Sequence, residues 1–225
     1  MAPFNFNPRA VVQVRALATF ASWNWQEQPF RSKDHRGRFI VHAIKGATDK
    51  LVGKHETLNV GPNGSAVTVT ADNFELIADY WARWAASIIR DEQLGQTIVL
   101  APLPSSKAVA DLADYRPLNL ARRVSRHLPG SKVWSGARFR HERLPVHAGG
   151  SRASIYEDMF FTSDTPDGVI VPIDDVFTQG AHLSALMKHL PENRWPKLML
   201  TGGKTANTPP DKVVYPPAHP FEFWG

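Results

Sequence analysis

The sequence predicts an α/β protein, with a parallel, twisted sheet flanked by helices and a small N-terminal β-rich lobe. Two largely apolar runs, at residues 97–102 and 169–173, are typical of strands that are buried on both faces of a sheet. Each run is followed by a polar turn and then by a helical pattern, and this β-α-β-α order is characteristic of parallel strands. A chain of 225 residues with 43% hydrophobic residues can bury a sizeable core.

The first 70 residues contain two segments with strand-like patterns. Residues 38–44 alternate between polar and apolar side chains, and residues 66–70 follow a tight turn at residues 61–64. We therefore predict a β-rich lobe, or hood, over residues 1–70, followed by an α/β core over residues 71–201.

A long helix is predicted to begin the core. Asp72 and Glu75 have the spacing of a capping box at a helix start. Large apolar side chains then recur at helical spacing, at Leu76, Tyr80, Trp81, Trp84 and Ile88. We expect this stripe to pack in the core, because a platform that stacks on a nucleobase has to be exposed.

The remaining core continues the alternation of strands and helices. Further elements are predicted as a helix from about residue 108, a helix over 118–128, a strand over 132–134 and a helix over 184–190. Ligands of such sheets bind outside the carboxyl ends of the parallel strands. The loops after residues 102 and 175 are therefore predicted to meet in one site.

The tail, residues 202–225, is rich in proline and ends in aromatic residues. Because proline disfavours regular elements, we predict an arm without helix or strand. The terminal aromatic side chains favour docking of this arm on its own domain or on a second subunit, which leaves a homodimer open.

Composition excludes several classes of protein and site. The absence of cysteine excludes disulfides, thiolate catalysis and cysteine-ligated zinc, and no apolar run reaches the roughly 20 residues that span a bilayer. We therefore expect a cytoplasmic protein without membrane contact. The net charge of +5 favours anionic ligands, but the basic residues are spread along the chain. Nucleic acid is compatible with this charge but is not favoured.

The most informative segment runs from Val169 to Leu183, where a buried strand leads through two acids and small residues into a helix. A helix start presents free backbone N–H groups, so residues 178–182 are predicted to wrap a phosphate, with Gly180 allowing close approach. Asp174 and Asp175 would repel that phosphate. They are therefore assigned to a ribose diol or to a metal ion carried by the ligand. The alternative is that this acidic pair only caps the following helix.

This segment resembles the phosphoribosyl-pyrophosphate (PRPP) motif of type I phosphoribosyltransferases. The matching residues are Asp174, Asp175, Val176, Phe177, Thr178, Gly180 and Ala181. The segment departs from the motif at Gln179 and His182, where the family usually has a hydroxyl residue. Both replacements can still donate hydrogen bonds.

Two further segments resemble the ComF-type branch of this family. Residues 100–104 with the following polar loop look like its first strand and pyrophosphate loop, and residues 115–122 look like its Arg-x-x-Asn helix. Residues 138–140 and 151–160 look like the Arg-rich flexible segment that precedes the PRPP strand. The zinc-binding cysteine module often found at the start of that branch is absent.

The resemblance implies a Mg²⁺-dependent reaction in which a base-like acceptor displaces pyrophosphate from PRPP. It implies a catalytic set of Asp174, Asp175, Lys107, Arg140 and Arg152, a pyrophosphate loop of Ser105, Ser106 and Lys107, and a 5-phosphate loop of Thr178, Gln179, Gly180, Ala181 and His182. The two aspartates would hold the ribose and, through water, the Mg²⁺. The cations would neutralise the leaving group. Residues 138–154 are either a lid or an ordinary exposed basic loop.

Two function hypotheses remain open on the sequence. The preferred one is an enzyme that transfers phosphoribose to a nitrogenous base. The alternative is a non-catalytic protein of the same fold that senses PRPP or a nucleotide, or that associates with nucleic acid, and the departures at Gln179 and His182 favour it. A hydrolase or phosphotransferase is a weaker option, because the sequence has neither GxSxG nor a Walker lysine loop.

Overall fold

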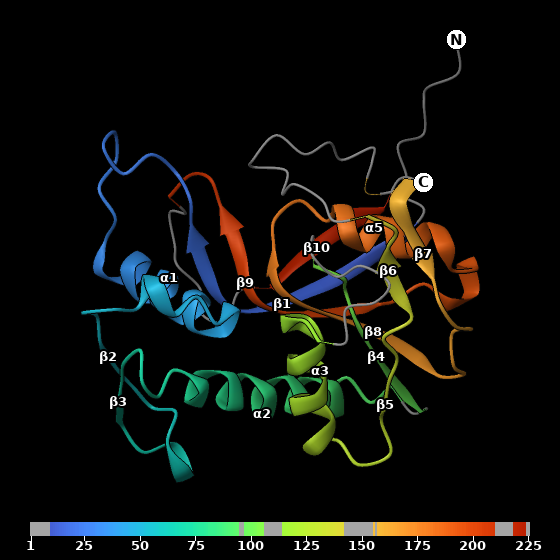
Figure 1. Cartoon of the computed structure of the whole chain (residues 1–225), viewed down its shortest axis with the longest axis horizontal. Helices are drawn as coiled ribbons and strands as arrows, with labels where there is room; N and C mark the ends of the chain where they lie inside the picture. The colour runs from blue at the N-terminus through green and yellow to red at the C-terminus, as the bar shows by residue number, and fades with distance from the viewer. Residues whose placement is uncertain are drawn as a thin grey trace.

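The computed structural model describes residues 10–94, 97–105, 114–141, 155, 157–209 and 218–223 (Figure 1). The strands of the central sheet are β1 (Ala10–Ala21), β4 (Ile98–Pro102), β5 (Lys132–Val133), β8 (Val169–Phe177), β9 (Leu198–Ala206) and β10 (Ala218–Phe223). They are ordered β10-β1-β9-β8-β4-β5. In this order, each strand from β1 through β9, β8 and β4 to β5 is parallel to its neighbours. At the edge of the sheet, β10 pairs antiparallel with β1. The predicted α/β class with a parallel sheet is therefore confirmed.

Helices and two short hairpins cover the sheet. The helices are α1 (Ser32–Lys45), α2 (Glu75–Asp91), α3 (Arg116–Arg126) and α5 (Ala181–His189), with single 3₁₀ turns at Thr48–Lys50, Pro62–Gly64 and Glu192–Arg194. The hairpins pair β2 (Glu56–Leu58) with β3 (Val67–Val69), and β6 (Ala137–Phe139) with β7 (Met159–Phe161). Among the described residues, no helix combines the length and apolarity needed to cross a bilayer.

The two faces of the sheet carry separate hydrophobic layers. Helices α1, α2 and α3 cover one face, and α5 with the β6–β7 hairpin covers the other (Figure 1). Successive strand residues alternate between the layers, as Ile170 faces α5 and Val171 faces the three helices. Trp81 of α2 is fully buried in the first layer, and its indole N–H donates to the carbonyl of Thr201 (3.0 Å). The prediction that this tryptophan is a core residue is confirmed.

Two crossovers fix the direction of the strands. Helix α3 lies between β4 and β5, and α5 lies between β8 and β9, and each pair of strands is parallel and adjacent. The helices predicted over 118–128 and 184–190 and the strand over 132–134 are confirmed with small shifts of their bounds. The helix predicted from about residue 108 begins outside the described residues.

The strand predicted over residues 38–44 is wrong, because this segment belongs to α1. Its alternation has a packing cause. Phe39 and Ile44 pack in the layer shared with α2, and Ile44 and Val41 also lie against β9, at Gly202 and Gly203. A Cβ on Gly203 would meet Val41 Cγ2 at 2.5 Å, so the missing side chain lets the helix approach the sheet closely.

The N-terminal β-rich lobe is smaller than predicted. Strand β1 pairs with β9 and β10 in the central sheet, so among residues 10–70, which the structure describes, only the β2–β3 hairpin forms a separate β structure. The start predicted for α2 also shifts: its N-cap is Phe74 rather than Asp72, and the Asn73 side chain instead accepts a hydrogen bond from the backbone of Thr70 (2.8 Å).

The tail contains regular structure, contrary to the prediction. Strand β9 continues to Ala206, and residues 218–223 form β10, which docks on β1 of the same chain. Pro220 pairs with Gln13 in this strand. Proline is tolerated there because β10 lies at the edge of the sheet.

Candidate functional site

The predicted site lies where β4 leaves the sheet and β8 continues. The last paired residues of these strands are Pro102 and Ile173, and the N–H of Leu103 donates to the carbonyl of Ile173 (2.8 Å). Beyond this point β8 pairs only with β9, up to Phe177 opposite Lys204. The loops that follow β4 and β8 therefore start at the same, carboxyl edge of the sheet, with β8 extending beyond β4 to Phe177. Their meeting in one site stays a prediction, because residues 106–113 lie outside the described residues.

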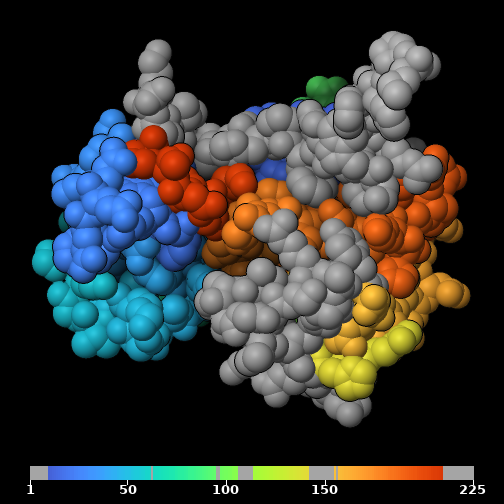
Figure 2. All heavy atoms as spheres, turned by 90° about the horizontal axis from the view of Figure 1, so that it is seen from above, coloured from blue at the N-terminus to red at the C-terminus, as the bar shows by residue number. Residues whose placement is uncertain are grey.

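Figure 2 views the molecule from above the upper side of Figure 1. The blue segment that follows β1, the red end of β9 and the orange residues of β8 and α5 lie side by side on this face, as the sheet order requires. The site is therefore built from segments far apart in the sequence.

The acidic pair lies inside β8 rather than after it, because the strand extends to Phe177. It does not cap the following helix, since the N-cap of α5 is Gly180. Asp174 is 8% exposed and Asp175 is half-buried. The N–H of Asp175 donates to Oδ1 of Asp174 (2.8 Å). The capping alternative is wrong, and the pair is available for another role.

The two carboxyl groups have different electrostatic environments. Burial raises the pKa of Asp174 well above its usual value, and the neighbouring charge of Asp175 raises it further. The backbone N–H of Asp175 and the charge of Lys45, at the end of α1, act in the opposite direction but do not cancel the increase. Asp174 therefore holds a proton more strongly than an exposed aspartate does, and the more accessible Asp175 lies beside it.

The loop between β8 and α5 ends in a left-handed glycine at the start of a helix. Gly180 is buried and left-handed, with φ 75°, and begins a helix of nine residues. Such a φ favours glycine, and the first N–H groups of a helix have no acceptor within it. Thr178 and Gln179 are exposed, while Ala181 and His182 are half-buried. The five predicted residues thus form one continuous turn at the carboxyl edge.

Lys204 of β9 supports this loop, and the sequence pattern did not identify it. Its Nζ donates to the carbonyl of Thr178 (3.0 Å) and lies 4.7 Å from the centre of the Phe177 ring. Burial lowers the pKa of this lysine. The hydroxyl groups of Thr178 and Thr205 are also 3.4 Å apart. The register between β8 and β9 therefore places a cation beneath the loop.

The β6–β7 hairpin closes the site on the β4 side. Phe139 contacts the His182 ring, with 5.7 Å between ring centres. Arg138 is 8% exposed and donates to the hydroxyl oxygen of Tyr115 (2.9 Å), whose own O–H donates to the carbonyl of Pro102 (3.3 Å). Burial raises the pKa of Tyr115 to about 12, and the charge of Asp174 adds to this increase, while Arg138 opposes it.

The structure places the remaining predicted residues as follows. Ser105 is half-buried in the loop after β4. Arg140 is exposed, and its guanidinium carbon lies 5.5 Å from the centre of the Phe160 ring. Ser106, Lys107 and Arg152 lie outside the described residues, as does most of the predicted lid. Arg138 and Tyr115 belong to segments that the sequence pattern singled out, but it indicated Arg140 rather than Arg138.

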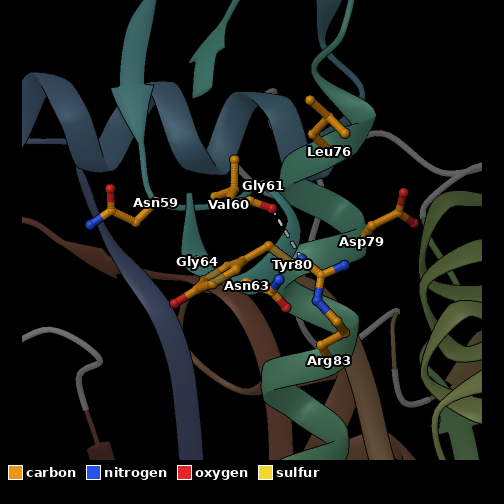
Figure 3. A pocket seen from close by; sticks show the side chains of 9 residues that line it. All are labelled: Asn59, Val60, Gly61, Asn63, Gly64, Leu76, Asp79, Tyr80 and Arg83. Carbon is orange, nitrogen blue, oxygen red and sulfur yellow. Dashed lines mark hydrogen bonds between the residues drawn. The ribbon is translucent and has the colours of Figure 1, made fainter. Parts of the chain in front are cut away.

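A cavity of about 510 Å³ lies elsewhere, between α2 and the loop that joins β2 to β3 (Figure 3). None of the predicted site residues lines it. Its charged groups already have partners, since Arg83 donates to the carbonyl of Val60 (3.0 Å) and Asp79 pairs with Arg123. The other polar side chains of its lining are those of Asn59, Asn63 and Tyr80.

A scan against models of known protein families finds no match to this chain, and a search of curated proteins finds no significant match either.

Proposed function

We propose that this chain is a type I phosphoribosyltransferase-like protein that binds PRPP with Mg²⁺ and transfers phosphoribose to a base-like acceptor, releasing pyrophosphate. One observation carries the proposal. An acidic pair on β8, of which Asp174 is buried and Asp175 half-buried, leads into a left-handed glycine at the start of α5, at the edge where β4 leaves the sheet. Phosphate and ribose need different groups a few residues apart, and this junction supplies both.

The order of the elements supports the same proposal. The strand β4 and its polar loop, the helix α3, and the β6–β7 hairpin precede β8 in the chain, in the order of the three segments on which the resemblance rests. The β6–β7 hairpin contains Arg138, whose guanidinium donates to the hydroxyl of Tyr115 near the end of β4.

In this proposal each part of PRPP contacts a different part of the edge. The 5-phosphate binds the N–H groups of residues 178–182, where the helix dipole adds a favourable field. Asp175, as the more accessible acid, accepts hydrogen bonds from the ribose hydroxyl groups, and buried Asp174 fixes its position through the Asp175 N–H. The diphosphate lies toward the loop after β4, which contains Ser105, Ser106 and Lys107.

The donor set fits a magnesium ion that arrives with the diphosphate. Carboxylate oxygens are ligands that Mg²⁺ prefers, and this ion usually keeps several waters and substrate oxygens. Asp174 and Asp175 supply such oxygens, and among the described residues no group of three or more His, Cys, Asp or Glu is placed to hold a metal. When bound, Mg²⁺ would neutralise charge on the leaving group. Lys107, Arg140 and Arg152 would add positive charge from the surrounding loops.

Two assays test the proposal in sequence. Calorimetric titration of the full chain with PRPP and Mg²⁺ measures binding, and a pyrophosphate-release assay over a panel of nitrogenous bases measures transfer. We expect binding followed by release with one class of base. Absence of PRPP binding would contradict the proposal.

A second candidate function is a PRPP or nucleotide sensor without turnover. The observation that favours it is the chemistry of the phosphate loop, where Gln179 and His182 replace hydroxyl groups and His182 lies against Phe139. PRPP binding without pyrophosphate release from any base would support this candidate over the enzyme.

A further inference from the structure

Arg138 is a buried cation without a carboxylate partner. Its side chain is 8% exposed, and in the described part of the chain no aspartate or glutamate forms an ion pair with it. A buried charge without a counterion is costly, and it is usually retained where a ligand or another group compensates it. An anion bound beside Arg138 would supply the counterion that the described residues do not.

The hydrogen bonds of Arg138 use only one side of its guanidinium group. Nη1 donates to the Tyr115 hydroxyl oxygen and to the carbonyl of Ala137, each at 2.9 Å. The Nε and Nη2 groups have no acceptor among the described residues, although a guanidinium fork suits two oxygens of one phosphate. Within the described part of the chain, Nε and Nη2 thus remain available for bidentate binding.

Tyr115 determines where this guanidinium lies. The arginine lies over the tyrosine ring, with 4.9 Å from the guanidinium carbon to the ring centre, and the tyrosine hydroxyl is bonded to the Pro102 carbonyl at the end of β4. The raised pKa of Tyr115 keeps its hydroxyl protonated at neutral pH, so the tyrosine does not neutralise the arginine. The positive charge is therefore directed to the start of the loop after β4.

We propose that Arg138, positioned by Tyr115, forms an anion subsite at the carboxyl end of β4, separate from the phosphate loop of α5. This inference rests on the proposed function, in which the anion is the diphosphate of PRPP. Arg138 contacts this group directly, whereas Tyr115 is a positioning residue. In this proposal Arg138 has the role that the sequence pattern assigned to Arg140, which is to neutralise the charge of the diphosphate.

The proposed subsite should bind only one of two ligands that have the same 5-phosphate. PRPP occupies both the α5 loop and the Arg138 subsite, whereas ribose 5-phosphate lacks the diphosphate and occupies only the loop. Loss of Arg138 should therefore weaken PRPP binding selectively, which a general loss of folding would not do.

Calorimetric titration of Arg138→Gln with each ligand, with Mg²⁺ present, tests this distinction. We expect PRPP affinity to fall at least tenfold, which corresponds to about 1.4 kcal/mol, and ribose 5-phosphate affinity to stay within about twofold. Arg138→Lys should fall between the wild type and Arg138→Gln, because it keeps the charge but loses the fork. Tyr115→Phe should also lower the ratio of PRPP to ribose 5-phosphate affinity, since the charge remains but is no longer held.

Arg194→Gln is the matched control. Arg194 is also partly buried and also donates to backbone carbonyls, those of Thr165 and Pro166, before β8 begins. We expect both affinities to be unchanged in this variant. If Arg138→Gln does not fold, the same ratio in Arg138→Lys decides. An equal change for both ligands, or no change, would overturn the subsite.

A separate probe distinguishes this failure from failure of the proposed function. If the wild type binds neither PRPP nor ribose 5-phosphate, the proposed function is wrong. The subsite is then tested with inorganic pyrophosphate alone, which should raise the unfolding temperature of the wild type and of Arg194→Gln but not that of Arg138→Gln. An equal rise in all three proteins would contradict the subsite.

Discussion

At the residue scale, two adjacent carboxyl groups have different environments. Asp174 is almost fully buried and accepts the N–H of its neighbour, whereas Asp175 is half-buried at the open edge of β8. The raised pKa of Asp174 means that the folded protein binds a proton more strongly there than the unfolded chain does. Ionisation of Asp174 in the folded protein therefore lowers the free energy of unfolding.

The pH dependence of stability follows from this difference. A raised folded pKa makes the free energy of unfolding fall as pH increases from the unfolded value, near 3.8, through the folded pKa. Asp174→Asn keeps an oxygen acceptor for the Asp175 N–H without a charge. We expect it to unfold at higher urea concentration than the wild type at neutral pH, and to lose this advantage toward about pH 4. A variant that is less stable than the wild type at neutral pH would contradict this account.

The effect of Gly180 on stability, through its backbone conformation, can be measured separately from its effect on PRPP binding. With φ 75°, any side chain there is strained by about 1 kcal/mol, and the same holds for Gly130 with φ 84° in the turn before β5. We expect Gly180→Ala and Gly130→Ala to lose similar stability in urea denaturation. Only Gly180→Ala should weaken PRPP binding, by about tenfold in calorimetry. Equal PRPP affinities in the two variants would count against a phosphate at this loop.

Some of these residues could be found from sequence and others could not. The acids and Gly180 form a local string in which each residue type has its own chemical reason, so the pattern indicated them. Lys204 and Arg138 depend on tertiary structure, since one reaches the loop through the β8–β9 register and the other through Tyr115. No local spacing records such pairings.

At the element scale, two glycines of β9 allow α1 to pack closely on the sheet. Gly202 faces Ile44, and Gly203 faces Val41, at distances that leave no room for a Cβ. The helix therefore packs directly on the backbone of the strand. This contact holds the end of α1, with Lys45, beside the acidic pair.

A side chain on Gly203 should separate this helix from the sheet. Gly203→Ala places a Cβ 2.5 Å from Val41 Cγ2, so we expect a loss of about 1–3 kcal/mol in the free energy of unfolding. Val41→Ala removes the clashing methyl groups. In urea denaturation the double variant should therefore be more stable than the sum of the two single effects predicts, by at least about 0.5 kcal/mol. Strictly additive effects would show that the two residues are not in contact.

Helices and strands were predicted correctly where the buried residues form a simple pattern along the sequence. Strands β4 and β8 are buried on both faces and appear as continuous apolar runs. Helix α1 was mistaken for a strand, because Val41 and Ile44 are buried against β9 while Phe39 packs in the layer shared with α2, which hides the helical period. Strand β10 was missed because its pairing with β1 joins the two ends of the chain, and proline suggested irregular structure.

At the scale of the whole molecule, topology determines where the site lies. The sheet order β1-β9-β8-β4 brings four carboxyl ends to one edge, and β4 ends earlier than its neighbour β8. The part of β8 that extends beyond the end of β4 contains the acidic pair. The α5 loop and the β6–β7 hairpin flank this part of the strand. The cavity beside α2 is lined by other elements and contains none of these residues.

The most direct test of the central claim is backbone NMR of the full chain during titration with PRPP and Mg²⁺. The account predicts that the largest chemical-shift changes occur at residues 174–183, with further changes at residues 103–105 and at Arg138. Changes concentrated at the cavity between α2 and the β2–β3 loop, or no changes at saturating PRPP, would contradict a PRPP site at the carboxyl edge of the sheet.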